Sequence, residues 1–389
     1  MSMLSALIPA ILITGLSLLV HRWLWLRLVR DAAFPEPWNR LFTAAFGLLA
    51  LGMPAGMIAT FLLPRGSAGP VAWAVYLWMG WLFLLMTLTI PLELVRLGWW
   101  TRRRLTHALP SPERRPLVAR VLSVSVGAVG AGATAFGVGR ATGAVPVRQV
   151  RIPVKGLSPG LSGFRIALLT DVHVGPTIRR PFVERLVEQT NALEPDLIAV
   201  TGDLVDGSVA NLGDDVRPFE NLRAKHGVYF VTGNHEYISG VEEWLRFLPT
   251  LGWRVLQNER VRLDLPGGAL DVAGVNDYSA GRQGPAHAPN LPRALEGRDP
   301  AVPVLLLAHQ PRAADEAARL GVNVQLSGHT HDGQIWPFRY AVRLTTPYVV
   351  GLHTVGDLQL YVSPGTGYWG PPMRVGTQAE ITEVELVPA

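Results

Sequence analysis

The chain has 389 residues, a length that allows two or three domains. Of these residues 49% are hydrophobic, which is a high fraction for a soluble enzyme. The net charge of +5 divides into +9 for residues 1–146 (13 basic, 4 acidic) and −4 for residues 147–389 (22 basic, 26 acidic). The basic excess therefore flanks apolar segments, and no nucleic-acid partner is expected. Cysteine is absent, which excludes disulfides, thiolate metal sites and a thiol nucleophile.

Four apolar segments precede the polar part of the chain. Three are uncharged and close to the roughly 20 residues that cross a bilayer core, so we predict transmembrane helices at Met1–Val20, Leu41–Leu63 and Val71–Leu92. The fourth, Val121–Gly139, is mostly Val, Ala, Gly and Ser, and inserts into lipid less favourably. It follows Arg114-Arg115, so the sequence leaves open whether it spans the membrane or belongs to a cleaved export signal.

The loops between these segments differ in their content of Arg, which marks the cytoplasmic side of a membrane protein. The first loop holds four Arg and the third holds seven, whereas the second holds only Arg65. We therefore expect a multi-pass protein of the cell membrane, with residues 147–389 on the outer, periplasmic or extracellular, face. If the fourth segment does not cross, these residues lie in the cytoplasm. His21 and His107 flank apolar segments and are expected at the membrane interface.

From Arg165 onward, short β-rich runs alternate with amphipathic helical segments, as in α/β domains. A helix is predicted over Pro181–Leu193, where Pro stands near the start and apolar residues fall on one side. We predict a membrane domain over residues 1–146, with about four transmembrane helices, and an α/β domain over residues 147–389. Its buried strands are predicted at Arg165–Thr170, Leu197–Thr201, Val228–Thr232, Val304–Leu307 and Val324–Leu326.

Each of these five strands leads directly into a short polar motif. The motifs are Asp171-Val-His173, Gly202-Asp203, Gly233-Asn234-His235-Glu236, Ala308-His309-Gln310 and Gly328-His329-Thr330-His331. Loops at the carboxyl ends of strands in an α/β sheet converge on one crevice, so we expect these residues to share one site. One such motif alone is more often an ordinary turn, but five in this order make chance a poor explanation. The Gly that precedes Asp203, Asn234 and His329 suggests turns with φ above zero.

The motifs offer nitrogen and oxygen ligands that suit hard to borderline divalent metals. Seven candidates are enough for two ions if one carboxylate is shared, namely Asp171, His173, Asp203, Asn234, His309, His329 and His331. Two ions about 3.5–4 Å apart can bind a phosphate ester, lower the pKa of a shared water and stabilise an in-line displacement. Phosphoryl chemistry is therefore expected, with Mn²⁺, Fe²⁺, Zn²⁺ or Co²⁺ all suited to the ligands.

The five motifs resemble those of the calcineurin-like metallophosphoesterase superfamily, and the resemblance covers about residues 147–389. The runs Gly328–Gln334 and Tyr361–Pro372 are similar to the membrane-associated bacterial branch of phosphodiesterases typified by YkuE and YaeI. The resemblance implies an α/β/β/α sandwich of two mixed sheets flanked by helices. It also implies one ion held by Asp171, His173, Asp203 and His331, and a second held by Asp203, Asn234, His309 and His329, with Asp203 as the bridge.

The same resemblance implies that His235 stabilises the transition state or protonates the leaving oxygen. Two residues depart from the bacterial branch, because Asp332 stands where Gly is frequent and Pro364 where a basic residue is frequent. Neither is a predicted ligand, so these departures concern the substrate more than the catalysis.

We therefore expect a membrane-anchored two-metal phosphoesterase in which a metal-bridging hydroxide attacks a phosphodiester or pyrophosphate, with His235 and Asp203 as catalytic residues. An anchored domain favours lipid or envelope substrates, and a UDP-diacylglucosamine-type pyrophosphatase is one alternative. A non-catalytic metal-binding membrane sensor is another, although a sensor has no need of a proton donor such as His235. The physiological substrate and the oligomeric state are left open.

Overall fold

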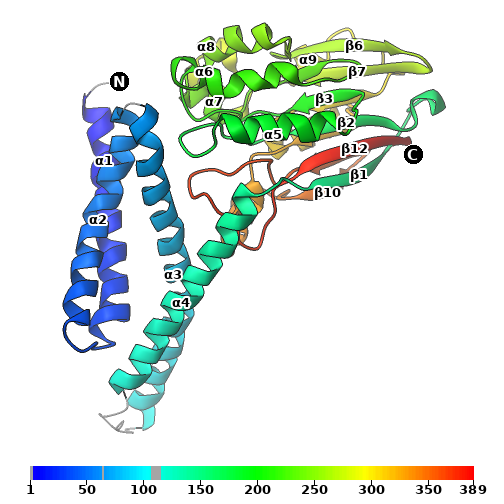
Figure 1. Cartoon of the computed structure of the whole chain (residues 1–389). Helices are drawn as coiled ribbons and strands as arrows, with labels where there is room; N and C mark the ends of the chain where they lie inside the picture. Colours follow the sequence, from blue (N-terminus) through cyan, green and yellow to red (C-terminus); the bar gives the residue numbers. More distant parts are fainter. Residues whose placement is uncertain (1–2, 64, 107–114) are drawn as a thin grey trace. The chain divides into compact units, whose positions relative to one another are not determined.

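The computed structural model describes residues 3–63, 65–106 and 115–389. The chain divides into two compact units, one of residues 1–139 with 370–373 and the other of residues 140–369 with 374–389. Four helices come first in the chain (Figure 1), and they are α1 (Met3–Trp25), α2 (Trp38–Leu62), α3 (Arg65–Thr106) and α4 (Arg115–Thr142). His107 and Arg114 lie outside the described residues.

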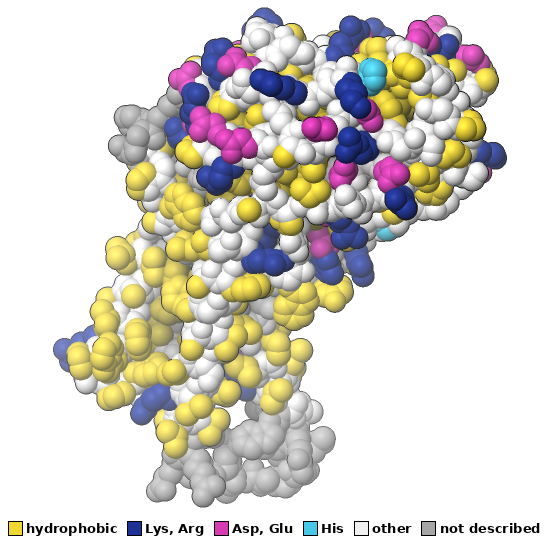
Figure 2. All heavy atoms as spheres, turned by 45° about the vertical axis from the view of Figure 1, so that its right-hand side comes forward, with side chains coloured by type: hydrophobic (Ala, Val, Ile, Leu, Met, Phe, Trp, Pro, Cys, Tyr) yellow, Lys and Arg dark blue, Asp and Glu magenta, His cyan; other side chains and the backbone are white. Residues whose placement is uncertain are grey.

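Each of these four helices contains a segment long and apolar enough to cross a membrane. The segments are Ile11–Arg30, Trp38–Thr60, Ala68–Gly98 and Pro116–Thr142. The first therefore extends beyond its predicted end at Val20, through a π-helical turn, Leu26–Arg30. The fourth lies within one continuous helix and is also of sufficient length. Yellow hydrophobic side chains cover much of the surface of these helices in Figure 2, as expected of helices that face lipid.

Charged residues at one end of the first apolar segment are held by ion pairs. Arg27 contacts Asp31 at 3.1 Å and Glu93 at 2.9 Å, and Arg96 contacts Glu93 at 3.1 Å. Mutual pairing of this kind lowers the cost of placing charges close to the hydrocarbon region. The helix can therefore continue past Val20 and include Arg27 and Arg30.

His21 is buried among the helices and lies within the first apolar segment, Ile11–Arg30, instead of at its flank. Trp78 Nε1 donates a hydrogen bond to His21 Nε2 at 2.9 Å, and His21 Nδ1 lies 2.8 Å from the carbonyl oxygen of Ser17. A hydrogen-bonded imidazole can be accommodated inside a helix bundle, where its polar atoms are satisfied without water. Hydropathy does not detect such pairing, which is why the sequence suggested an interface.

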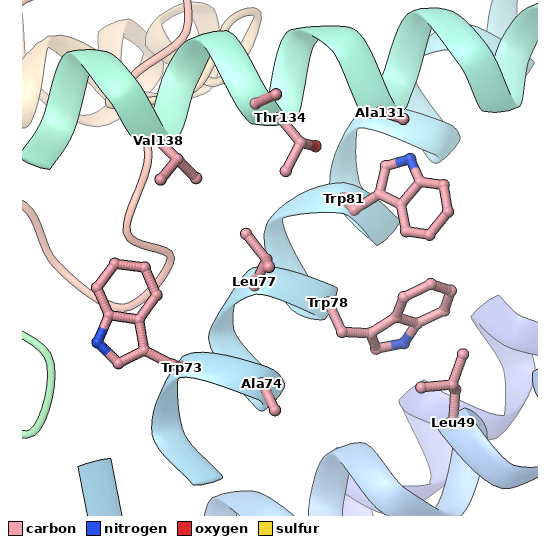
Figure 3. Close-up of a pocket in the computed structure, with 10 residues that line it drawn as sticks. Leu49, Trp73, Ala74, Leu77, Trp78, Trp81, Ala131, Thr134 and Val138 are labelled. Atoms are coloured by element: carbon pink, nitrogen blue, oxygen red, sulfur yellow. The ribbon is translucent and has the colours of Figure 1, made fainter. Parts of the chain in front are cut away.

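The first unit also contains a cavity of about 660 Å³ between α2, α3 and α4 (Figure 3). Its lining residues are Leu49, Trp73, Ala74, Leu77, Trp78, Trp81, Ala131, Thr134, Ala135 and Val138. The walls are therefore almost entirely apolar. Trp81 Nε1 and Thr134 Oγ1 have no hydrogen-bond partner within the described residues. None of the candidate ligands lies in this cavity.

The second unit is built on two six-stranded mixed sheets. The first sheet has, in spatial order, β1 (Val147–Val154), β12 (Ile381–Pro388), β2 (Phe164–Leu169), β3 (Leu197–Val200), β4 (Val228–Phe230) and β5 (Arg254–Val255). The second has β10 (Gly351–Val355), β11 (Leu358–Val362), β9 (Val324–Ser327), β8 (Val304–Leu307), β7 (Gly268–Gly274) and β6 (Glu259–Leu265).

Side chains from both sheets form one buried core between them. In β2, Ile166 and Leu168 point into this core, whereas Ala167 and Leu169 belong to a second core under the outer helices. Strands that are buried on both faces have continuous apolar runs, which is why the sequence identified β2, β3, β4, β8 and β9. The strands agree with the predicted ranges to within one or two residues.

Helices cover the outer face of each sheet. The first sheet is covered by α5 (Arg180–Asn191), α6 (Val209–Val216) and α8 (Val241–Phe247), and the second by α9 (Leu291–Ala294) and α10 (Ala314–Arg319). Figure 1 shows α5 lying along β2 and β3. The predicted helix at Pro181–Leu193 corresponds to α5. The expected α/β/β/α sandwich is therefore confirmed.

Candidate metal centre

The five polar motifs lie at the carboxyl ends of the strands that precede them. The strands β2, β3 and β4 are parallel in the first sheet, and β7, β8 and β9 are parallel in the second. Parallel strands end at the same edge of a sheet, so their following loops meet there. The structure brings together all seven predicted ligands, and His235, at the start of α7 (Asn234–Ile238), lies beside them.

The first group of ligand atoms belongs to Asp171, His173 and His331, whose donor atoms all lie within 4.8 Å of one another. His331 Nε2 is 3.4 Å from Asp171 Oδ1 and 3.0 Å from His173 Nε2. Two nitrogen ligands of one ion, each about 2.0–2.1 Å from it, can be at most about 4.2 Å apart. These two separations are therefore short enough for ligands of one ion.

The second group is formed by Asp203, His309 and His329. His309 Nε2 lies 3.2 Å from Asp203 Oδ2 and 3.2 Å from His329 Nδ1. The amide oxygen of Asn234 joins the group, at 3.3 Å from the same His309 nitrogen. All of these separations are again short enough for ligands of a single ion.

Asp203 lies between the two groups. Its Oδ2 atom is 3.9 Å from His173 Nε2, in addition to its contact with His309. Burial disfavours a charged carboxyl, yet His309, His235 and His173 hold the pKa of Asp203 well below its ordinary value. A carboxylate in this position, charged and shared by imidazoles from both groups, has the geometry and charge that a bridging ligand needs.

The backbone at the site adopts a conformation that L residues rarely use. Five of the seven predicted ligands have positive φ, and they are Asp171 (52°), His173 (54°), Asp203 (50°), His329 (72°) and His331 (49°). Each such residue costs of the order of 1–3 kcal/mol, and residues of this kind cluster at functional sites. The rest of the fold must therefore hold these side chains in their convergent arrangement.

The expectation that the preceding glycines adopt positive φ holds for Gly202 (φ 87°) but is wrong for Gly233, whose φ is −99°, and for Gly328. These two glycines are needed for space. A Cβ atom on Gly233 would overlap with Asp203 Oδ1, and one on Gly328 would overlap with Asp171 Oδ2. The ligand carboxylates approach the backbone so closely that no side chain fits there.

Asp206 is a functional residue that the sequence interpretation missed. Its Oδ1 atom lies 2.9 Å from His173 Nδ1 and 2.7 Å from His235 Nδ1. Burial opposes its charge, but hydrogen bonds and charge interactions with both imidazoles lower the pKa of Asp206 to about 2. A carboxylate that accepts from Nδ1 fixes the ring orientation and leaves Nε2 free for a metal or a substrate. The only sequence signal is its position three residues after Asp203.

Replacing Asp206 by Asn is expected to weaken metal binding about 10- to 100-fold at the group that contains His173, because residues that orient a ligand typically have effects of this size. Competition between the full-length protein and a coloured chelator measures the affinity. Asp264→Asn, at an exposed position of β6, is the matched control. Equal affinities of the two variants would show that Asp206 does not orient the ligand.

His235 is more accessible than His173 and His309, with 16% of its side chain exposed against 1% and 0%. Its Nε2 atom lies 4.0 Å from Asp203 Oδ2. Burial lowers the pKa of His235, but the hydrogen bond to Asp206 and the nearby charge of Asp203 outweigh it and raise the pKa to about 9. In the absence of bound ions the imidazole of His235 is therefore protonated at neutral pH, and it lies partly exposed beside the predicted ligands.

The ring of His309 and the turn at Asp203 are held by buried hydrogen bonds. His309 Nδ1 donates to the carbonyl oxygen of Thr201 at 2.8 Å, which directs Nε2 toward Asp203. The carboxylate of Glu236 accepts from the backbone N–H groups of Asp203 and Leu204, at 3.0 and 2.7 Å. Burial and the nearby Asp203 raise the pKa of Glu236 to about 7. Glu236 thus holds the backbone turn that carries Asp203.

Pro364 and Asp332 each lie beside an Arg side chain, Pro364 beside Arg374 and Asp332 beside Arg339 of α11 (Phe338–Thr345). The buried guanidinium of Arg374 donates to the carbonyl oxygens of Pro364 at 2.8 Å and Gly367 at 2.6 Å, so a positive charge is present at this loop despite Pro364. Burial lowers the pKa of Arg374 to about 10, and the group stays charged at neutral pH. Asp332 forms an ion pair with Arg339 of α11.

Residues 164–333 match the family model described as calcineurin-like phosphoesterase. An uncharacterized metallophosphoesterase of Aquifex aeolicus is 34% identical over 242 residues, which are 62% of this chain and 91% of that protein. A Bos taurus transmembrane protein with metallophosphoesterase domain is 43% identical over 251 residues, 62% of this chain and 56% of that protein. The chain thus spans little more than half the length of this relative.

A Danio rerio protein of the same description is 36% identical over 292 residues, covering 73% of this chain and 65% of that protein. Among solved structures, a 5'-nucleotidase precursor from Thermus thermophilus is similar over 57% of this chain and 54% of that chain, with 16% sequence identity and a TM-score of 0.37.

Proposed function

The chain belongs to the calcineurin-like metallophosphoesterase family, and from this premise we propose that it is a membrane-anchored phosphoesterase that uses two divalent metal ions. The observation that carries the proposal is the position of Asp203 between two groups of ligands, each with separations suited to one ion. A site built only for one structural ion needs neither the second group nor an accessible cationic imidazole beside it.

The proposed ligand assignment follows the two groups. One ion is held by Asp171, His173, Asp203 and His331, and the other by Asp203, Asn234, His309 and His329. In support of this assignment, each imidazole of His173 and His309 is oriented through Nδ1 by a hydrogen-bond acceptor, which leaves Nε2 for the ion. The N/O ligand set suits Mn²⁺, Fe²⁺, Zn²⁺ or Co²⁺.

Two such ions would lower the pKa of a bound water and offset the charge of the phosphoryl oxygens. The chain itself supplies the remaining groups. His235 Nδ1 is held by Asp206, so its Nε2–H is directed away from that carboxylate and can donate to a phosphoryl or leaving-group oxygen. The hydrogen bond to Asp206 and the charges of Asp203 and Asp206 raise the pKa of His235, which favours the protonated imidazole.

Substrate access favours a phosphodiester or pyrophosphate carried by a larger group. Asp171, His173 and Asp203 are buried, whereas Asn234, His235 and His329 are partly exposed, so the phosphoryl group approaches from the side of these three. The ring of the exposed Trp369 lies 5.7 Å from that of His235 and offers an apolar surface beside it. We therefore propose a lipid-linked or envelope-derived phosphoester as the substrate class.

Hydrolysis of bis-p-nitrophenyl phosphate by the full-length protein tests the proposed function. We expect activity that requires added Mn²⁺, Fe²⁺, Zn²⁺ or Co²⁺ and that disappears on chelation. Assay of p-nitrophenyl phosphate beside it separates diesterase from monoesterase activity. Bound metal without hydrolysis of either compound would instead favour a metal-binding sensor.

We also propose that all four apolar helices cross the membrane and that residues 147–389 face outward. The proposal rests on the distribution of Arg between the loops and on the length of Pro116–Thr142. Alkaline phosphatase fused after Val147 is expected to be active, and green fluorescent protein at the same position is expected to be dark. The opposite pair of results would place the domain in the cytoplasm.

A further inference from the structure

The segment Ser363–Trp369, which follows β11, contains none of the predicted ligands, yet it packs against the candidate metal centre. We call this segment the inner loop. Every residue of it except Trp369 is buried. The inner loop and Arg374 both belong to the second unit, as do all of the predicted ligands.

Backbone hydrogen bonds join the inner loop to the turn after β2. The N–H of Thr366 donates to the carbonyl oxygen of Thr170 at 2.7 Å, and the N–H of Gly367 donates to that of Asp171 at 3.0 Å. In the other direction, the N–H of Thr170 donates to Thr366 Oγ1 at 3.2 Å. The turn that carries Asp171 and His173 is therefore bonded to the inner loop.

Two glycines allow the inner loop to approach the ligands so closely. A Cβ atom on Gly367 would overlap with the carbonyl oxygen of Val172. A Cβ atom on Gly365 would lie 3.0 Å from Asp171 Cβ and 3.3 Å from His331 Nδ1. Gly365 also has a φ of 89°, a conformation that L residues rarely adopt. The inner loop thus contacts two ligands of the first group, with no room for a side chain between them.

The inner loop is itself held by the side chain of Arg374. The guanidinium donates to the carbonyl oxygens of Pro364 at 2.8 Å and Gly367 at 2.6 Å. Arg374 Nη1 donates to the carbonyl oxygen of His331 at 3.4 Å, and Nη2 lies 3.4 Å from His331 Nδ1. One side chain therefore contacts both the inner loop and a predicted ligand.

The use of a buried cation here indicates that the position of the loop matters. Arg374 is 1% exposed, and every oxygen to which it donates within the described residues is a main-chain carbonyl. A guanidinium has several N–H donors in fixed directions and can therefore fix carbonyl groups that surround it. Removing a charge from water is costly, and a well-packed apolar side chain can stabilise a core as well as buried charges do.

The ligands that these contacts reach are the ones that need support. Asp171, His173 and His331 have φ values of 52°, 54° and 49°. Residues in this conformation persist only where the surrounding structure fixes them. We propose that Arg374 is a positioning residue for the first group of ligands, which it holds in their convergent arrangement through the inner loop. This inference rests on the proposed two-metal function.

Stepwise binding of Mn²⁺ to the metal-free full-length protein, measured by competition with a coloured chelator, tests this role. Arg374→Met is expected to weaken one of the two ions about 10- to 100-fold, the range for residues that orient a ligand, and to leave the other nearly unchanged. Arg298→Met is the matched control, because Arg298 also donates to a main-chain carbonyl oxygen, that of Leu320 at the end of α10, at 3.1 Å.

Double variants identify the ion that is weakened. In His329→Asn, a ligand of the second group is lost, so the ion that remains tightly bound is that of the first group, and adding Arg374→Met is expected to weaken it. In His331→Asn, the tightly bound ion is that of the second group, and adding Arg374→Met is expected to leave its affinity unchanged. The opposite pattern would overturn the proposal, because it would couple Arg374 to the second group.

Arg374→Lys separates directed hydrogen bonds from charge. Lysine keeps the positive charge but lacks the planar set of donors, so this variant is expected to weaken the same ion as Arg374→Met. Wild-type affinity of the lysine variant for both ions would contradict positioning by directed hydrogen bonds.

The remaining outcomes distinguish the positioning role from a general effect on the fold. Equal weakening of both ions by Arg374→Met, or unchanged affinity for both, would overturn the proposal. If circular dichroism shows that Arg374→Met does not fold, Gly367→Ala makes the same test, because its Cβ displaces the inner loop from Val172 while Arg374 is retained. A wild-type chain that binds fewer than two ions would instead refute the proposed function.

Discussion

Replacing Asp203 by Asn is expected to weaken both metal ions at once. Residues that only orient a ligand change metal affinity about 10- to 100-fold, so loss of a charged ligand shared by two cations is expected to exceed about 100-fold. Asn has nearly the same shape, and its Oδ1 can still accept the 2.8 Å hydrogen bond from His235 N. The fold is therefore expected to persist, which circular dichroism can verify.

Elemental analysis of the purified full-length variant measures the ions per chain, and the rate on bis-p-nitrophenyl phosphate is recorded in parallel. Asp264→Asn again provides a control of equal chemistry at an exposed position. A variant that loses one ion and keeps the other at wild-type affinity would show that Asp203 serves a single ion. Two ions bound at wild-type affinity would show that the charge of Asp203 contributes to neither metal site.

Replacing His235 by Gln is expected to leave the metal content unchanged and to lower the rate in a way that depends on the leaving group. A general acid contributes typically about 10²–10⁴-fold when the departing oxygen is strongly basic, and much less when it leaves readily as p-nitrophenolate. The variant is therefore expected to lose far more activity on an alkyl phosphodiester than on bis-p-nitrophenyl phosphate. Steady-state rates on both substrates, with metal analysis, check this.

Other results would assign a different role to His235. Equal losses on both substrates would favour electrostatic stabilisation of the phosphoryl oxygens over proton donation. A loss of bound metal would make His235 a ligand, which its 4.0 Å separation from Asp203 Oδ2 permits. Undiminished rates would leave the accessible imidazole without a catalytic role.

The sequence predicted the centre of the fold because the strands there are buried on both faces. Continuous apolar runs such as Val304–Leu307 ended in polar motifs, and this pattern identified both the strands and the predicted ligands. The other strands were not identified, including the largely buried β11 and β12. β1 has mostly exposed residues and β10 has no fully buried one, so neither has an apolar run that distinguishes it from a loop.

The groups that orient the predicted ligands, such as the Asp206 carboxylate, could not be identified from the sequence. Asp206 contacts His173 from 33 positions away in the chain, and Thr201 O accepts from His309 across 108 positions. These contacts form because loops that follow parallel strands of the two sheets meet at one edge. A short sequence motif carries no information about such contacts. Likewise, the reason for Gly233 and Gly328 is the close approach of carboxylates from other loops. Motif types predicted which residues meet, and tertiary packing determined how they are held.

A metal titration of the full-length protein tests the two-ion proposal most directly. Metal-free protein is titrated with Mn²⁺ while bound ions per chain and hydrolysis of bis-p-nitrophenyl phosphate are followed together. The two groups of ligands around Asp203 predict that activity rises to its maximum as the second ion binds, at two ions per chain. Full activity with one ion per chain, or two tightly bound ions without hydrolysis, would contradict the account.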